Sequence, residues 1–597
     1  MAPSTLSPTY PPATRNEAQR LGWDRLDVIL VTGDAYIDSP FIGTAVIARV
    51  LLDAGYRVGV IAQPDTASGR DITRLGEPEL FWGVSAGCLD SMVANTTASG
   101  KRRRQDDLTP GGVNNRRPDR AAIIYTNLIR RHFKPTAPIV LGGIEASLRR
   151  ISHYDAWSNA VRRSILFDAK ADLLVYGMAE ETILAVAATL HQGAGIDGFR
   201  DIRGLCYAHS GIPEPSPGFP GPDVVLPGHK EVRRDREAFT RMFRHFYENA
   251  DPFTARRLLQ QQDTRFLVQN PPPLPMPPSA LDRIHELPFT RDLHPFHRPE
   301  GPVRALETIR FALATHRGCF GECRFCAITV HQGRHVISRS EASILREASA
   351  LTAHPRFKGI ISDVGGPTAN MYGFECRRKQ REGACRDKGC LFPAVCRKLP
   401  VRHDRQIRLL KQLRELPGVR RVFIASGIRY DMILTDRKYG KKYLEEILLH
   451  HVSGQLKIAP EHVAPEVLEL MGKPGPERLE AFIRLFERLK RKNACNLFLT
   501  YYFMAAHPGC TASDMAELRT FAEKRLRLLP EQTQIFTPTP ATWSTLMYHT
   551  GMDPFSGKAI FVEKDPAAKA RQKAAVTPGC GPRNPRRRAR ASGRPSR

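Results

Sequence analysis

Two series of short β-rich segments, each alternating with segments of helical periodicity, constrain the fold of this chain more than any other feature. The first series places apolar runs at 26–31, 57–62, 80–85, 138–143 and 171–176, and residues 42–52 between the first two have apolar side chains at helical spacing. Strand, helix and strand with short joins predict parallel βαβ units. We therefore expect a doubly wound α/β domain over residues 24–190, with ligands at the carboxyl ends of its strands.

The second series follows a proline-rich stretch at 271–278, which cannot be a helix interior and predicts a stiff extended connector. Six strand candidates come after it, with amphipathic segments such as 477–490 and 512–529 between them. Six βα units in succession predict a partial (βα)6 barrel whose site lies at the strand carboxyl ends. The candidates are 310–315, 358–363, 421–424, 455–458, 496–503 and 532–537.

The remaining segments complete a predicted domain plan. Residues 1–23 are expected to be a disordered leader, 191–300 a connecting region that includes the proline-rich linker, 301–563 the barrel domain and 564–597 a disordered basic tail. Within the first domain, the basic segment 101–120 is interpreted as a surface insertion.

Cysteine usage indicates the cellular compartment and the kind of site. Seven of the twelve cysteines fall between Cys319 and Cys396, and residues 1–19 lack the apolar segment of a secretory signal. A tight cysteine cluster in a large chain of this kind indicates metal or cofactor binding rather than a disulfide framework. No apolar run approaches the ~20 residues of a membrane span, so we expect a protein of the reducing cytoplasm without membrane contact.

The motif that carries chemistry directly follows the first strand of the second series. Cys319, Cys323 and Cys326 have the spacing C-x3-C-x2-C, and three thiolates on one short loop can ligate three irons of a four-iron cluster. No fourth cysteine continues the run, which leaves one iron open for substrate or cofactor chemistry. A structural zinc ion prefers four ligands in paired spacings, and this loop does not supply them alone.

These residues resemble the radical S-adenosylmethionine (SAM) superfamily, in which C-x3-C-x-φ-C follows the first barrel strand and Phe325 is the aromatic φ. More narrowly, the chain resembles the YgiQ family of radical SAM proteins over about residues 26–562. The segments that carry this likeness are 317–334 (RGCFGECRFCAITVHQGR), 362–372 (SDVGGPTANMY), 456–462 (LKIAPEH), 505–509 (AAHPG) and 31–38 (VTGDAYID).

The resemblance implies a specific cofactor site. Cys319, Cys323 and Cys326 would hold one [4Fe-4S] cluster, whose open iron would chelate the amino and carboxylate groups of SAM. One electron, delivered by a reductant such as flavodoxin or ferredoxin, would cleave SAM to methionine and a 5′-deoxyadenosyl radical that abstracts hydrogen from a substrate the sequence does not name. The protein would supply ligation, orientation and exclusion of water.

The same resemblance suggests which other residues meet SAM. Gly365 and Gly366 match the superfamily's glycine motif, whose backbone meets the SAM amino group. Ser426 and Arg429, after the third strand, stand where ribose or carboxylate contacts arise, although loops at a barrel rim also carry polar residues without a ligand role.

A second cysteine group leaves two interpretations open. Cys376, Cys385, Cys390 and Cys396 lie in a stretch rich in Arg and Lys, and their spacing matches no common zinc or ferredoxin pattern. They could bind a second metal, which is our hypothesis, or they could be reduced structural thiols.

The first domain raises the question of a second cofactor. Doubly wound domains ahead of radical SAM barrels often resemble cobalamin-binding modules, and those that hold cobalamin through a histidine use D-x-H-x-x-G after the first strand. Here Asp34 is followed by Tyr36 where that histidine would stand. The likeness is then one of fold only, and we do not predict cobalamin.

Two other functions remain as alternatives. One is a radical SAM methyl or methylthio transferase acting on RNA or protein, suggested by the domain order and the net charge of +28. The other is a non-enzymatic iron–sulfur or zinc protein that binds nucleic acid. Nucleic acid is not the favoured partner, because no aromatic residues interleave with the arginines of the tail. His331 and His507 lie in motif-like loops and are expected to be structural.

Overall fold

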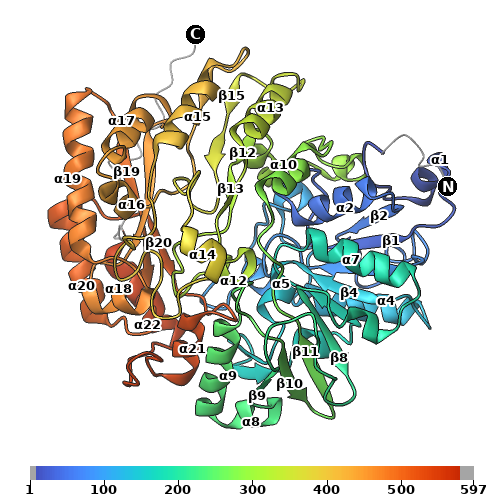
Figure 1. Cartoon of the computed structure of the whole chain (residues 1–597). Coiled ribbons are helices and arrows are strands. Elements are labelled where there is room, and N and C mark those ends of the chain that lie inside the picture. The colour runs from blue at the N-terminus through green and yellow to red at the C-terminus, as the bar shows by residue number, and fades with distance from the viewer. Residues whose placement is uncertain (1–7, 578–597) are drawn as a thin grey trace.

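The computed structural model describes residues 8–577, which form two α/β halves (Figure 1). The N-terminal half runs from blue to green and the C-terminal half from yellow to red, and the two lie side by side. Within the described residues, no helix is long and apolar enough to cross a membrane.

A nine-stranded sheet organises the N-terminal half. Its five parallel strands match the five runs of the first predicted series, which confirms them. Their order along the sheet is β2, β1, β3, β4 and β7. The bounds are β1 Val28–Thr32, β2 Val58–Ala62, β3 Phe81–Ser85, β4 Ile139–Gly142 and β7 Leu173–Val175.

Helices cover both faces of this sheet because its strands are apolar on both sides. Along β1, Val28 and Leu30 belong to an apolar cluster with residues of α2 and α7, whereas Ile29 and Val31 belong to a separate cluster that includes residues of α4 on the opposite face. The doubly wound architecture is thereby confirmed. The helices of this half are α1 Arg15–Arg20, α2 Gly43–Asp53, α3 Ser91–Asn95, α4 Ala121–His132, α5 Gly143–Leu148, α6 Ile165–Asp168, α7 Glu180–His191, α8 His229–Arg234 and α9 Arg236–Glu248.

The sheet does not end at residue 190, where the sequence placed a domain boundary. Strands from the expected connecting region continue it, and β8 and β11 pair antiparallel with their neighbours. The sequence hid them because β10 reads Leu-Leu-Gln-Gln-Gln, and its buried Gln260 and Gln262 are satisfied by hydrogen bonds rather than by apolar packing. The bounds are β8 Leu205–His209, β9 Val224–Leu226, β10 Leu258–Gln262 and β11 Arg265–Gln269, with a separate hairpin of β5 His153–Asp155 and β6 Ala160–Arg162.

The C-terminal half carries the six strands of the second series in their predicted order. Parallel pairs join β12 to β16, β15 to β17, and β18 to β19 and β20, and a single parallel bridge between Ile428 and Ile458 links the third strand to the fourth. The second predicted strand is interrupted at Ser362, so it appears as β15 and β16. The bounds are β12 Ala312–Ala314, β15 Ile360–Ile361, β16 Asp363–Gly365, β17 Arg421–Val422, β18 Gln455–Glu461, β19 Phe498–Ala505 and β20 Gln532–Ile535.

Amphipathic helices cover the outer face of this partial barrel (Figure 1). α19 shows the pattern most clearly, since Leu479, Phe482, Phe486 and Leu489 are buried at helical spacing. The helices are α10 Pro278–Glu286, α11 Arg304–Ile309, α12 Ile328–Gln332, α13 Glu341–Thr352, α14 Arg377–Glu382, α15 Asp404–Glu415, α16 Tyr430–Thr435, α17 Gly440–His450, α18 Pro465–Met471, α19 Pro476–Lys492, α20 Ala512–Phe521, α21 Trp543–Thr550 and α22 Pro566–Val576.

Both predicted disordered ends are wrong within the described residues. Near the N-terminus, α1 begins with a capping box between Thr14 and Glu17, and Ala13 and Ala18 are buried. Near the C-terminus, α22 packs on α20 and buries Val576 completely. The rest of the predicted leader, residues 1–7, and of the basic tail, residues 578–597, lies outside the described part of the chain.

Candidate functional site

The three motif cysteines lie on one loop that follows the two-residue strand β13 His316–Arg317, which pairs with β14 Ile337–Ser338. Gly318 begins the loop with φ of +81°, and a Cβ there would stand 2.0 Å from the carbonyl oxygen of His335, so no side chain fits. The amide of Cys326 donates to the carbonyl of Cys323 at 2.9 Å, and the amide of Arg324 donates to the carbonyl of Met471 at 2.9 Å. The loop is therefore tied to itself and to the end of α18.

The thiols of this loop face one another around Gly321. A Cβ on Gly321 would lie 3.2 Å from Cys319 Sγ and 3.5 Å from Cys323 Sγ, and the amide of Gly321 donates to Cys319 Sγ at 3.3 Å. Burial, and then the neighbouring Cys323, raise the pKa of Cys319, and the same two causes raise the pKa of Cys326 to about 12. Half-buried thiols on one short loop are unfavourable together as bare thiolates and suit a positively charged metal group.

The geometry of this donor set distinguishes a cluster from a single ion. Among residues 8–577, no three His, Cys, Asp or Glu side chains gather closely enough to hold one metal ion. A four-iron cluster takes each thiolate on a different iron, so its ligands stand farther apart. Three thiolates on one loop suit a [4Fe-4S] cluster, whereas a structural zinc ion takes four protein ligands.

The predicted glycine pair lies beside the cysteine loop. Gly365 ends β16, and a Cβ on Gly366 would come within 2.6 Å of His316 Nε2 and 2.8 Å of the His316 carbonyl oxygen. Thr368 follows, and its Oγ1 lies 3.9 Å from Cys319 Sγ. The segment that contains the glycine pair thus lies next to the first cysteine.

Ser426 and Arg429 take up different positions. The hydroxyl of Ser426 donates to Asp363 on β16, and the amide of Ser426 donates to the same carboxylate at 3.1 Å. Arg429 is buried, pairs with Asp431 through two hydrogen bonds of 2.9 and 2.6 Å, and points Nη1 at Cys323 Sγ at 3.7 Å. Arg429 therefore faces the cysteine loop.

Phe325 is half-buried and stands edge-on to the ring of His507, 6.3 Å between centroids. Hydrogen bonds of 2.7 Å to Ser544 and 2.8 Å to the Pro508 carbonyl occupy both ring nitrogens of His507, which is the structural role expected for it. The ring of His331 contacts Ser147 Oγ at 3.0 Å.

A cavity of about 530 Å³ lies between the two halves. The carboxyl ends of β1, β3, β4 and β7 form one wall, and the carboxyl ends of β12 and β16 form the other. Gly365, Gly366 and Ser426 line it, whereas the three cysteines, Phe325 and Arg429 are not among its lining residues. The two parallel sheets thus point their site-bearing ends at one shared space.

The sequence analysis did not identify three polar residues that line this cavity: Glu180, His285 and His316. Arg317 Nη1 donates to Glu180 Oε1 at 2.5 Å, so an ion pair connects α7 with the strand that precedes the cysteine loop. No local signal could have found this contact, because its partners are 137 positions apart in the sequence.

The second cysteine group is not gathered closely enough to hold a single metal ion, and a second cluster there stays a prediction. Cys376, Cys390 and Cys396 belong to a small apolar cluster around Phe320, and the ammonium group of Lys379 donates to Cys390 Sγ at 3.8 Å. Among residues 8–577, these three cysteines and Cys385 are not part of a group that could hold one ion, and the structural-thiol interpretation stays open beside a second cluster.

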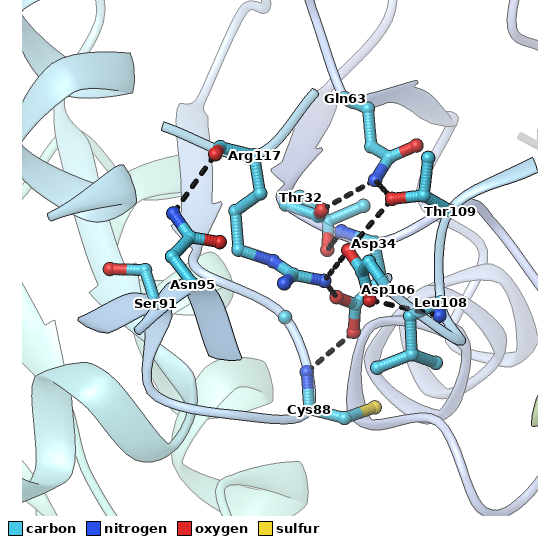
Figure 2. Close-up of polar contacts among 12 residues, drawn as sticks. Thr32, Asp34, Gln63, Cys88, Ser91, Asn95, Asp106, Leu108, Thr109 and Arg117 are labelled. Atoms are coloured by element: carbon cyan, nitrogen blue, oxygen red, sulfur yellow. Dashed lines mark hydrogen bonds and ion pairs between the residues drawn. The ribbon is translucent and has the colours of Figure 1, made fainter. Parts of the chain in front are cut away.

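Asp34 of the N-terminal motif is buried in an ion-pair network (Figure 2). Arg117 Nη2 lies 2.6 Å from Asp34 Oδ1 and 3.0 Å from Asp106 Oδ2, and the amide of Cys88 donates to Asp34 Oδ2 at 2.6 Å. The predicted surface insertion 101–120 is exposed at residues 101–105, whereas Asp106 and Arg117 are buried. Tyr36 is also buried and is not among the residues that line the cavity.

Comparison with known proteins gives the class to which the chain belongs. Residues 10–312 match the model of the radical SAM N-terminal domain, and residues 313–522 match that of the radical SAM superfamily. The chain is a radical SAM enzyme.

Relatives that match this chain over nearly its full length identify the family within this class. A UPF0313 protein of Fusobacterium nucleatum is 51% identical over 95% of this chain and 98% of its own length, and one of Methanosarcina mazei is 47% identical over 94% and 93%. The chain belongs to the UPF0313 (YgiQ-type) family, as the sequence motifs predicted.

Solved structures of similar fold are distant. The radical SAM methyltransferase TsrM of Kitasatospora setae is 14% identical with a TM-score of 0.45, covering 86% of this chain and 74% of its own. The cobalamin-dependent enzyme OxsB is 13% identical with a TM-score of 0.47, covering 88% of this chain and 56% of its own.

Proposed function

We propose that this enzyme holds a [4Fe-4S] cluster on Cys319, Cys323 and Cys326 and reductively cleaves SAM to start a radical reaction on a substrate bound between its two halves. The observation that carries the proposal is the contact between the cysteine loop and the glycine segment, where Cys319 Sγ lies 3.9 Å from Thr368 Oγ1. A cluster bound at the three thiolates would supply one electron for cleavage of SAM to methionine and a 5′-deoxyadenosyl radical.

The chain's own residues would bind and orient SAM. Gly366 has no side chain, so its backbone can meet the SAM amino group directly. Ser426 lines the same cavity as Gly366. Its hydroxyl group is oriented by the hydrogen bond that it donates to Asp363. In this proposal Gly365, Gly366 and Ser426 contact SAM.

Arg429 and Phe325 would act on the cluster side of the site. Arg429 directs an N–H group at the thiolate of Cys323, and hydrogen bonds to cluster sulfurs raise the reduction potential. Phe325 would cover the cysteine loop, with its ring packed edge-on against His507.

The proposal includes a cytoplasmic setting and a low-potential reductant such as flavodoxin or ferredoxin, because one electron must reach the cluster for each cleavage. It assigns no role to cobalamin. Support for that part comes from Tyr36, which stands where the cobalamin-binding motif has histidine and is buried away from the cavity.

Product analysis tests the proposal. The anaerobically reconstituted protein, reduced with dithionite in the presence of SAM, should release 5′-deoxyadenosine and methionine slowly even without substrate. Release of S-adenosylhomocysteine in place of 5′-deoxyadenosine would instead indicate methyl transfer. A protein that binds iron but neither binds nor cleaves SAM would contradict the proposal.

A further inference from the structure

The wall of the central cavity holds three buried polar atoms that have no hydrogen-bond partner. They are Glu180 Oε2, His285 Nδ1 and His316 Nε2, and their residues are at most 6% exposed. Buried polar atoms are almost always paired in folded proteins, because an unpaired one has lost its water without replacement. Three such atoms in residues that line one cavity indicate a ligand that supplies the missing hydrogen bonds.

The charge of the wall restricts what that ligand can be. Glu180 shares its negative charge with Arg317 through Oε1, which leaves Oε2 free as an acceptor. Burial lowers the pKa of His316 to about 4, and burial together with Arg339, Arg317 and Arg291 lowers the pKa of His285 well below its usual value. Both imidazoles are therefore neutral at pH 7, and the charges of Glu180 and Arg317 cancel. Asp363 is the remaining charged residue of the lining, and its carboxylate accepts hydrogen bonds from the amides of Ala425 and Ser426.

The rest of the wall is apolar. Val31, Val84, Val140 and Val175 line the cavity from β1, β3, β4 and β7, and Ile47 of α2 lies beside them. Ser85, Gly142 and Gly177 add little side-chain volume at the same strand ends, so this side is open to a broad molecule. The volume of about 530 Å³ is in the usual range of small-molecule sites.

We propose that this cavity is the substrate site of the SAM-dependent reaction and that it takes a neutral, largely apolar molecule whose N–H or O–H group donates to Glu180 Oε2. The inference rests on the proposed function, because Gly365, Gly366 and Ser426 line the same cavity and a molecule bound there lies beside the SAM site. The apolar body rests on the strand ends of the N-terminal half. The Glu180–Arg317 pair then connects substrate recognition with the strand that leads into the cysteine loop.

The experiment uses two neutral probes that differ in one donor. 2-Naphthol has an O–H group on a flat apolar body, and 2-methoxynaphthalene has the same body without that donor. Binding to the reconstituted protein is measured by equilibrium dialysis with SAM present, so that the SAM contacts are occupied. This binding measurement needs no turnover. A failure of the probes to bind is therefore distinguishable from a failure of the enzyme to cleave SAM.

Three variants decide the outcome. Glu180→Gln keeps an oxygen for Arg317 but replaces the free acceptor by an N–H donor, and Glu181→Gln makes the same change at the adjacent exposed residue. Ile47→Trp fills the cavity without touching Glu180. Circular dichroism and thermal unfolding confirm that each variant is folded.

We expect 2-naphthol to bind the unaltered protein and Glu181→Gln at least about tenfold more tightly than 2-methoxynaphthalene, since a bond to a charged acceptor is worth that much. Glu180→Gln should remove this preference, and Ile47→Trp should remove binding of both probes. The proposal is overturned if both probes bind equally to the unaltered protein, if Ile47→Trp binds them as well, or if neither probe binds the unaltered protein with SAM present.

Discussion

Arg117 Nη2 lies 2.6 Å from Asp34 Oδ1 with both side chains buried, and it also reaches Asp106 Oδ2 at 3.0 Å (Figure 2). A single guanidinium thus joins the motif after β1 to the segment 101–120. Burial raises the pKa of Asp34 against the opposing effect of Arg117, so the carboxylate depends on this partner for its charge.

Replacement of Arg117 should therefore destabilise the N-terminal half. Arg117→Met leaves two buried carboxylates without their cation, and we expect a loss of about 3–5 kcal/mol in the free energy of unfolding by urea. The control Arg102→Met removes an exposed pair with Asp119 and should cost no more than about 0.5 kcal/mol. Equal losses in the free energy of unfolding for the two variants would show that the buried network contributes no more to stability than the exposed ion pair.

Gly366→Ala should weaken SAM binding without loss of the cluster. The added Cβ would meet the His316 carbonyl oxygen at 2.8 Å, and overpacking of about 1.4 kcal/mol or more corresponds to a tenfold loss of affinity. Iron content and SAM binding by equilibrium dialysis are measured together. Gly211→Ala, where a Cβ meets nothing within 4 Å, is the control. Unchanged SAM affinity would remove Gly366 from the proposed SAM site.

Arg429→Lys should shift the cluster to a more negative reduction potential. The change keeps a positive charge for Asp431 but removes the N–H group that points at Cys323 Sγ, and sulfur hydrogen bonds stabilise the reduced cluster. An anaerobic redox titration followed by electron paramagnetic resonance measures the shift, with the exposed Arg408→Lys as the control. Identical potentials would mean that Arg429 has a packing role only.

Asp251 gives a pH dependence of stability. Burial opposes its charge, but hydrogen bonds from His335 and from the amide of Ala384 outweigh burial and lower its pKa to about 2. A carboxylate with a lowered folded-state pKa stabilises the protein above its unfolded value of 3.8, and this contribution is lost as the pH falls towards 2. Asp251→Asn should cost roughly 2 kcal/mol at pH 7 and progressively less below pH 4.

Urea unfolding of metal-free protein at several pH values tests this expectation, since acid would release iron from a cluster. A cost of Asp251→Asn that stays the same at pH 3 and pH 7 would contradict the linkage. The matched variant Asp263→Asn changes an exposed carboxylate and should show little effect at either pH.

The parts that sequence patterns predicted well were those in which local pattern and tertiary structure agree. The five parallel strands of the first sheet are continuous apolar runs, and the cysteine loop comes after the first barrel strand β12 as predicted, with the two-residue strand β13 between them. Patterns failed where tertiary contacts override local composition. The buried glutamines of β10 read as polar, Arg117 read as part of a charged surface, and α22 read as a disordered tail although Val576 is buried.

The same distinction between local pattern and tertiary contact applies to the candidate site. Spacing indicated the thiols, and the family resemblance indicated the glycine pair, because each is a short segment. Glu180 and His285 reach the cavity from segments far from the motifs, so only the folded chain places them beside Gly366.

The most direct test of the central claim is the electron paramagnetic resonance spectrum of the reconstituted, dithionite-reduced protein with and without SAM, beside a triple variant Cys319→Ala, Cys323→Ala, Cys326→Ala. The account predicts a [4Fe-4S]⁺ signal that changes when SAM is added, and no such signal in the triple variant. A cluster signal that SAM leaves unchanged, or one that survives in the triple variant, would contradict it.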